Sequence, residues 1–311
     1  MTFIRRLIVF SLLLTASCGF ILYELQSSND AMIRFLYGTR FGALLRKAVT
    51  ANPYASSLVG WFTNRSLSRY AIGGFVASQN INLNETQRSE VCQYISFNDF
   101  FTRELKPGAR TIDEDPQVIV SPADGQIYVV QNLSPTSELI VKEKAFSIEK
   151  LLNNTELAHN YYGGTAYIVY LAPHNYHRFH FPLDCTPQAP ITISGKYESV
   201  NLLVYRLGFQ PLTENERHLI MLKTQTVGDV AFVAVGALCV GKITETFTPN
   251  EPVLKGAEAG YYSFGGSTVV LLFAPNTITI DPELTKATEF VTIQMGQKIG
   301  SIKSKSLEDL D

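Results

Sequence analysis

The chain has 311 residues, of which 46% are hydrophobic and 17% charged, with 21 glycines and 14 prolines. This composition excludes an intrinsically disordered chain, a collagen, a coiled coil and a small disulfide-rich protein, and at ~150 residues per domain the length predicts one large domain or two unequal ones. The formal net charge is −2, yet residues 31–84 carry six Lys or Arg side chains and no Asp or Glu.

An uncharged apolar run opens the chain at residues 7–23, which read LIVFSLLLTASCGFILY. At ~1.5 Å of rise per residue a helix of this length reaches about 25 Å, the short end of what spans a ~30 Å hydrocarbon core. Segment 1–30 is therefore expected to be either a retained membrane anchor or a cleaved signal peptide. Two arginines lie on each side of the run, so its orientation stays open.

Residues 31–107 are predicted to form a basic, helical, membrane-associating portion. Apolar residues recur at steps of three and four between Ile33 and Val49, and Pro53 is expected to end the run. Aromatic side chains are interleaved with the positive charges: Phe35, Tyr37, Phe41, Trp61 and Phe62. Such a surface suits a nucleic-acid backbone or an anionic bilayer, and the neighbouring apolar run favours the bilayer. The alternative is a solvated positive face above core aromatics.

Residues 108–311 change to short β-branched runs separated by Gly, Pro and Asn. Runs without intervening helical repeats predict a mainly antiparallel β sandwich or barrel-like catalytic domain, and hence an α+β protein overall. The expected strands are 118–120, 127–130, 166–172, 218–223, 230–243, 269–273 and 290–293.

Three of the five histidines lie within residues 173–182, at His174, His177 and His180. A spacing of three distributes them over different faces of a helix or a strand, and no metal-binding motif accompanies them. The four cysteines are scattered and show no paired spacing. We therefore predict histidines that transfer protons near neutral pH in a bent loop, with a packing role as the alternative, especially for His174.

A carboxylate follows the expected strand 118–120 in the sequence Ser121-Pro122-Ala123-Asp124-Gly125. An Asp-Gly pair at the end of a strand ordinarily forms a turn, and Asp124 gains a catalytic interpretation only with a chemical partner.

A glycine pair precedes a hydroxyl residue in Gly265-Gly266-Ser267-Thr268. Glycine permits backbone torsions closed to other residues and leaves the Gly266 carbonyl unscreened, so a neighbouring hydroxyl could reach it. The ordinary interpretation is a glycine turn into a core strand. A serine-hydrolase elbow is not predicted, because Val269 occupies the position of the second glycine of G-x-S-x-G.

Five motifs in order resemble phosphatidylserine decarboxylases, especially the bacterial membrane-bound kind, over residues 31–303. Gly265 stands where the commoner form of the family has leucine, as in its Gly-Gly-Ser-Thr branch. The motifs are Phe100-Phe101-Thr102-Arg103-Glu104-Leu105-Lys106-Pro107, Ser121-Pro122-Ala123-Asp124-Gly125, Tyr176-His177-Arg178-Phe179-His180, Asn215-Glu216-Arg217 and Gly265-Gly266-Ser267-Thr268.

The resemblance implies a chain that cleaves itself between Gly266 and Ser267. In this scheme His180, oriented by Asp124, takes the proton of the Ser267 hydroxyl, which attacks the Gly266 carbonyl and converts the amide into an ester. Elimination and loss of ammonia then leave a pyruvoyl group in place of the serine. The products are a β chain, 1–266, and an α chain, 267–311, which form a heterodimer.

The resemblance also implies the reaction, which is decarboxylation of phosphatidylserine to phosphatidylethanolamine. The pyruvoyl carbonyl, joined to the substrate amine as an imine, accepts the electrons that CO2 leaves behind, and His177 is the candidate for protonating the carbanion or assisting the step. No metal, nucleotide or nucleic acid is expected.

The expected partners are phosphatidylserine and the membrane that holds it, at a bacterial inner membrane or, as a second choice, a mitochondrial one. Assembly beyond the heterodimer stays open. The alternatives are a non-catalytic lipid-binding protein of the same fold and a serine esterase.

Overall fold

A computed structural model describes residues 30–50, 60–135, 138–139, 144–237, 242–265, 267–287 and 289–303. The expected anchor or signal run, the expected helix break at Pro53 and the cleavage-site residue Gly266 lie outside these ranges. Within them, no helix combines the length and the apolar character that crossing a membrane requires.

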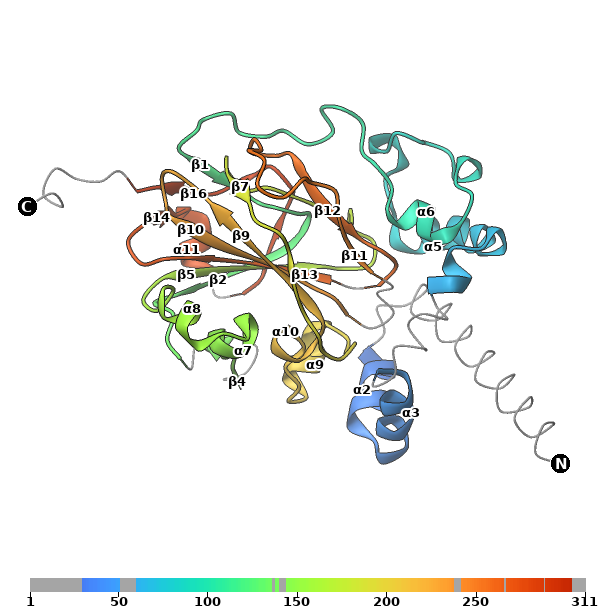
Figure 1. Ribbon diagram of the computed structural model, residues 1–311. Coiled ribbons are helices and arrows are strands. Elements are labelled where there is room, and N and C mark those ends of the chain that lie inside the picture. The colour runs from blue at the N-terminus through green and yellow to red at the C-terminus, as the bar shows by residue number, and fades with distance from the viewer. Residues whose placement is uncertain are drawn as a thin grey trace, which may run out of the picture.

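One eight-stranded antiparallel sheet forms the centre of the molecule (Figure 1). In spatial order its strands are β15 (Val291–Ile293), β2 (Gly125–Gln131), β5 (Thr165–Leu171), β13 (Ser267–Phe273), β10 (Asp229–Val235), β9 (Arg217–Lys223) and β7 (Thr186–Pro187), with β8 (Ile191–Ile193) also pairing with β9. The predicted antiparallel fold is confirmed. Over the described residues the end strands β15 and β7 do not pair, so the sheet is open and not closed on itself.

Two three-stranded sheets lie over one face of the central sheet. The first contains β1 (Val118–Val120), β16 (Lys298–Ile302) and β14 (Ile278–Ile280), and the second contains β11 (Ile243–Glu245), β12 (Glu258–Tyr262) and β6 (Arg178–His180). A short hairpin joins β3 (Glu138–Leu139) to β4 (Lys144–Ala145). The run predicted as one strand over 230–243 is wrong in extent, because β10 ends at Val235 and β11 belongs to a different sheet.

The central strand β13 is buried along its whole length because both faces of the sheet are covered. Val269, Leu271 and Phe273 point into the core beneath the smaller sheets, where Phe179 and Phe181 also lie. Val270 and Leu272 point to the opposite core, which is covered by short helices in residues 148–159 and 202–214 (Figure 1). Burial on both faces explains why β13 reads as an uninterrupted apolar run.

Five short helices interrupt the β portion, which the sequence prediction missed. They are α7 (Ile148–Leu152), α8 (Thr155–His159), α9 (Leu202–Arg206), α10 (Pro211–Glu214) and α11 (Pro282–Lys286). Each has only four or five residues, too few to produce a helical period in the sequence. Their caps were the available signal: the side chains of Ser147, Asn154 and Asn201 each accept a hydrogen bond from a backbone amide of the first turn.

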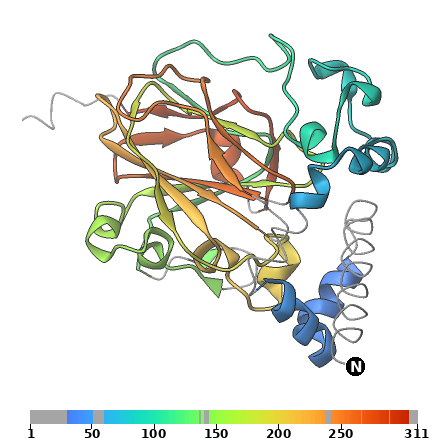
Figure 2. The same ribbon diagram turned by 45° about the vertical axis from the view of Figure 1, so that its right-hand side comes forward.

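The N-terminal portion is helical, as predicted, and divides into two groups (Figures 1 and 2). Helices α2 (Asp30–Gly38) and α3 (Arg40–Thr50) pack near α9, and Glu198 there accepts bonds from Tyr37 Oη at 2.9 Å and Arg46 Nη1 at 2.5 Å. The second group contains η1 (Ser66–Ala71), α5 (Ile72–Gln79), η2 (Leu83–Glu85), η3 (Val91–Gln93) and α6 (Phe97–Phe101). Its aromatic core includes Phe264, from the loop that precedes β13.

Candidate active site

Ser267 is the first residue of β13 and is completely buried. Its register partner is Leu171, the last residue of β5, so the chain enters β13 beside the point where it leaves β5 for the histidine loop. Among the described residues the structure gives Ser267 Oγ no hydrogen-bond partner. A buried hydroxyl without a partner is costly, which makes this atom a candidate for chemistry.

The loop before Ser267 is held from two sides. The Tyr262 amide donates to the His177 carbonyl at 2.9 Å, and the Phe264 amide donates to Asn98 Oδ1 at 2.9 Å. Gly265 has a φ of +141°, a backbone conformation that residues with a side chain rarely adopt. The glycine that the sequence singled out is thus required by the path of the chain directly before the expected cleavage site.

His177 is a buried ring with one free nitrogen. Its Nδ1 lies 2.9 Å from the Asn175 carbonyl oxygen, and because a carbonyl can only accept, Nδ1 carries the hydrogen. Nε2 therefore presents a lone pair, for which the described residues supply no hydrogen-bond partner. The ring packs on Phe101 with centroids 4.0 Å apart. Burial lowers the pKa of His177 to about 3, so the ring is neutral.

The Gly265 backbone lies near His177. This backbone acts to raise the pKa of the ring, although no contact with the geometry of a hydrogen bond reaches Nε2 among the described residues. The free lone pair is therefore beside the loop that leads into Ser267.

His180, in β6, has partners on both ring nitrogens. Nδ1 donates to the Gly256 carbonyl at 2.9 Å, so Nε2 accepts from the Tyr176 hydroxyl at 3.1 Å. Burial lowers the pKa of His180, and the negative charge of Asp124 acts in the opposite direction. The two loop histidines thus differ: the acceptor nitrogen of His177 has no partner among the described residues, and that of His180 accepts from Tyr176.

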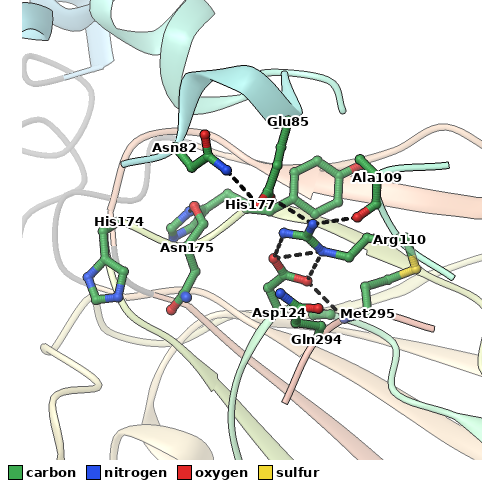
Figure 3. Close-up of polar contacts among 12 residues, drawn as sticks. Asn82, Glu85, Ala109, Arg110, Asp124, His174, Asn175, His177, Gln294 and Met295 are labelled. Atoms are coloured by element: carbon green, nitrogen blue, oxygen red, sulfur yellow. Dashed lines mark hydrogen bonds and ion pairs between the residues drawn. The ribbon is translucent and has the colours of Figure 1, made fainter. Parts of the chain in front are cut away.

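Asp124 is buried and bound to an arginine (Figure 3). Arg110 donates to its carboxylate from Nε at 3.0 Å and from Nη2 at 2.6 Å, and the Met295 amide donates at 2.8 Å. Arg110 also donates to Glu85 at 2.8 Å. No hydrogen bond joins the Asp124 and His180 side chains among the described contacts. The negative charge of Asp124 acts on the His180 ring, raising its pKa. The His180 amide also donates at 2.7 Å to the carbonyl of Pro122, two residues before Asp124.

The segment after α6 runs beside the histidine loop, which the sequence did not predict. The Thr102 carbonyl accepts from Arg178 Nε at 3.0 Å, and Glu104 forms an ion pair with Arg178 at 3.1 Å. Arg103 donates to the carbonyls of His174 and Asn175 at 2.9 and 3.0 Å. Two of the sequence motifs therefore meet in space, and the first supplies polar groups to the surroundings of the second.

The sequence analysis missed Arg103, Arg110 and Tyr176 as members of this site. Arg103 follows Phe100 and Phe101 with only Thr102 between, and a charge so close to an aromatic pair was the available signal. Nothing in the sequence marks Arg110 as the partner of Asp124. His174, in contrast, is exposed and takes part through its backbone carbonyl. Within the described ranges, no group of three or more His, Cys, Asp or Glu side chains is arranged to hold a metal ion.

Known proteins match the part of the chain that contains the candidate site. A family model described as phosphatidylserine decarboxylase matches residues 97–301. The chain is 41% identical over 274 residues to the phosphatidylserine decarboxylase proenzyme of Chlamydia trachomatis serovar L2, covering 87% of this chain and 91% of the relative. It is 41% identical over 279 residues to the proenzyme of the same name from Fusobacterium nucleatum, covering 89% and 93%. The chain belongs to the phosphatidylserine decarboxylase family.

The four predicted site residues of this phosphatidylserine decarboxylase family member all lie within the family match. Asp124, His177, His180 and Ser267 all lie within residues 97–301, as do Arg103 and α6. Helices α2, α3 and α5 precede the match. The part of the chain that carries the site chemistry is therefore the part that the family model describes.

Proposed function

We propose that this chain is a phosphatidylserine decarboxylase that matures by breaking its own backbone between Gly266 and Ser267. The observation that carries the proposal is the Ser267 hydroxyl, which is completely buried and has no hydrogen-bond partner among the described residues. The word proenzyme in the names of the bacterial relatives supports a maturation step. The products are a β chain, 1–266, and an α chain, 267–311, which remain together as a heterodimer.

In the cleavage step, Ser267 Oγ bonds to the carbonyl carbon of Gly266 and the amide C–N bond breaks. The hydroxyl proton passes to a base and then to the released amine, which leaves an ester. Loss of the Ser267 α-proton breaks the ester C–O bond and frees the carboxylate of the β chain. Water then replaces the nitrogen, which leaves as ammonia, and position 267 becomes a pyruvoyl group.

His180 is our proposed base for the cleavage step. Its Nδ1–H is fixed on the Gly256 carbonyl, so the basic lone pair is on Nε2, and the charge of Asp124 favours the protonated ring. Tyr176 occupies that lone pair in the structure and has to release it or pass the proton on. Arg110 and the Met295 amide hold the Asp124 carboxylate in place.

The buried start of β13 suits a pyruvoyl group, because a ketone there is shielded from water. Among the described residues the Ser267 hydroxyl makes no hydrogen bond that conversion to the ketone would remove. This group supplies a carbonyl that takes up the substrate amine and accepts the electrons released with CO2. His177 presents its Nε2 lone pair near the Gly265 backbone, two residues before this position, and packs on Phe101. A substrate anion raises the pKa of a neighbouring histidine, which would turn His177 from an acceptor into a proton donor.

We further infer that the enzyme works on a membrane surface, because its proposed substrate is a phospholipid. Phe41, Leu44 and Trp61 are 64%, 65% and 55% exposed, and Arg40 and Lys47 lie close to the first two in sequence. Apolar and aromatic side chains with nearby cations favour an anionic interface. The bacterial relatives support the inner membrane of a bacterium as the location.

Mass spectrometry of freshly purified protein tests the maturation step. We expect two chains, the smaller beginning at position 267 with the mass of a pyruvoyl group in place of serine, and release of CO2 from phosphatidylserine in liposomes. An intact Ser267 in a fully active preparation contradicts the proposal. Liposome binding without CO2 release identifies a lipid-binding protein, and labelling of Ser267 by a fluorophosphonate identifies an esterase.

A further inference from the structure

Arg103 is a buried arginine with one unused arm. Its side chain is 4% exposed, and Nη2 donates to the His174 and Asn175 carbonyls. Nη1 is buried and has no hydrogen-bond partner among the described residues. The arginine is thus fixed in position by one nitrogen while its other terminal nitrogen is left to bind something else.

The charge of Arg103 has no ion-pair partner among the described residues, although its guanidinium lies over the Phe100 ring at 5.0 Å. The neighbouring arginines of the site each pair with carboxylates: Arg110 with Asp124 and Glu85, and Arg178 with Glu104 and Glu258. No such pair is formed by Arg103 within the described residues, although burial lowers its pKa only to about 10, which keeps it charged at neutral pH. Asp124, which is paired with Arg110, contributes only a Coulombic interaction to Arg103, and a buried cation without a paired anion is unfavourable, so this position suits a bound anion.

Arg103 and His177 share one acceptor. The Asn175 carbonyl oxygen accepts from Arg103 Nη2 at 3.0 Å and from His177 Nδ1 at 2.9 Å. A ligand that meets the free Nε2 of His177 is therefore within a headgroup's length of the guanidinium.

The proposed substrate carries two anions near its amine, a carboxylate and a phosphodiester. The carboxylate leaves as neutral CO2, and a guanidinium bound to it would stabilise the substrate more than the transition state, which slows the reaction. The phosphodiester is unchanged from substrate to product, and the planar guanidinium fork matches its oxygens. We propose that Arg103 Nη1 binds the phosphodiester of the phospholipid headgroup, an inference that rests on the proposed function.

Reductive trapping measures binding at this contact independently of catalytic turnover. Mature protein is titrated with glycerophosphoethanolamine, ethanolamine or serine in the presence of cyanoborohydride, and the mass gain of the chain that begins at position 267 is recorded. In Arg103→Met we expect the half-saturating concentration of glycerophosphoethanolamine to rise about 10- to 100-fold, the loss of one charge-assisted contact, while that of ethanolamine stays the same. Arg103→Lys, which keeps the charge without the fork, should show a smaller rise.

The matched control is Arg88→Met. Arg88 belongs to the same helical group, and it pairs with Asp99 at 2.7 Å and stacks over Tyr94 at 4.2 Å. It should shift none of the three titrations.

Equal losses for glycerophosphoethanolamine and ethanolamine would assign Arg103 to loop structure alone, and a loss confined to serine would assign it to the carboxylate. No change in either Arg103 variant also overturns the proposal. If the Arg103→Met chain is not cleaved, the same titrations on Arg103→Lys decide whether the proposal holds. Absence of any trapped adduct in the wild-type protein counts against the pyruvoyl group, and so against the proposed function itself.

Discussion

Two buried arginines show how the candidate site differs from the opposite face of the central sheet, where Arg217 contacts α7. Arg103 and Arg217 are 4% and 3% exposed, and burial lowers the pKa of each to about 10. Arg217 uses every nitrogen, donating to the backbone carbonyls of Leu151, Asn215 and Lys150 at 2.6, 2.7 and 2.5 Å. Arg103 Nη1 has no hydrogen-bond partner in the part of the chain that the structure describes. The two arginines are equally buried, yet all guanidinium nitrogens of Arg217 are hydrogen-bonded, and Nη1 of Arg103 has no partner among the described residues.

The Nη1 atom of Arg103 is not an isolated case. Four buried side-chain polar atoms lack a hydrogen-bond partner among the described residues, and three of them, Arg103 Nη1, His177 Nε2 and Ser267 Oγ, belong to the candidate site. The fourth is Arg46 Nε, whose guanidinium otherwise pairs with Glu198 and stacks on Phe209 at 4.3 Å. Unsatisfied groups cost stability, so their concentration at one place indicates that function retains them.

The largest effect is expected from Ser267→Ala. The methyl group fills the same space without an attacking oxygen, so we expect one uncleaved chain and no detectable CO2 release. Denaturing electrophoresis and a CO2 assay measure both outcomes. Ser267→Thr keeps a hydroxyl and serves as the control, with partial cleavage expected. Two chains cut before position 267 in the alanine variant would place the nucleophile elsewhere.

The two histidines should separate maturation from turnover. His180→Ala removes the proposed base, and we expect the chain to remain uncleaved. His177→Ala leaves that base in place, so we expect cleavage to proceed while kcat for decarboxylation falls about 10²- to 10⁴-fold, the usual worth of a positioned proton-transfer group. Gel densitometry and CO2 release measure the two steps independently. The reverse pattern would exchange the roles of the rings.

Much of the fold could be predicted from the sequence because the central strands have strong local signals. β13 is apolar at nearly every position after the glycine pair, and its predicted range lies inside the observed strand. The five short helices could not be found in this way, since a single turn has no period and depends on tertiary packing. The end of β10 at Val235 was also missed, because the sequence continues with mostly apolar residues through Val240.

For the site, the sequence identified the reactive side chains but not their neighbours. Ser267, His177 and His180 were recognisable from motifs that carry chemistry, and the register of β13 with β5 brings the first beside the loop of the other two. The role of Asn175 depends on a backbone carbonyl, which no residue identity encodes. The Arg110–Asp124 pair joins residues fourteen positions apart through the path of a loop, which has no sequence pattern.

Arg217→Met should sharpen the contrast between the two arginines. It leaves the Leu151, Asn215 and Lys150 carbonyls without their donor, and we expect a loss of about 2–4 kcal/mol in the free energy of unfolding. Urea denaturation measures the loss in the uncleaved Ser267→Ala background, where one chain unfolds. Arg88→Met, which disrupts a more exposed pair, should cost about 1 kcal/mol or less. Decarboxylation per folded molecule should be unchanged in Arg217→Met, and a large loss there would extend the active site to the opposite side.

The dependence of stability on pH tests the neutral state of His177. Its pKa is lowered by burial from 6.5 to about 3, so between these values the unfolded chain binds a proton that the folded chain does not. Stability from this group is complete above pH 6.5 and falls as the pH drops toward 3, by about 1.4 kcal/mol per unit. In the Ser267→Ala background, His177→Phe should reduce the slope of unfolding free energy against pH between 4 and 6 by roughly that amount. Equal slopes in the two proteins would mean that His177 is protonated in the folded chain. Its Nε2 would then be a donor in need of an acceptor and not a lone pair.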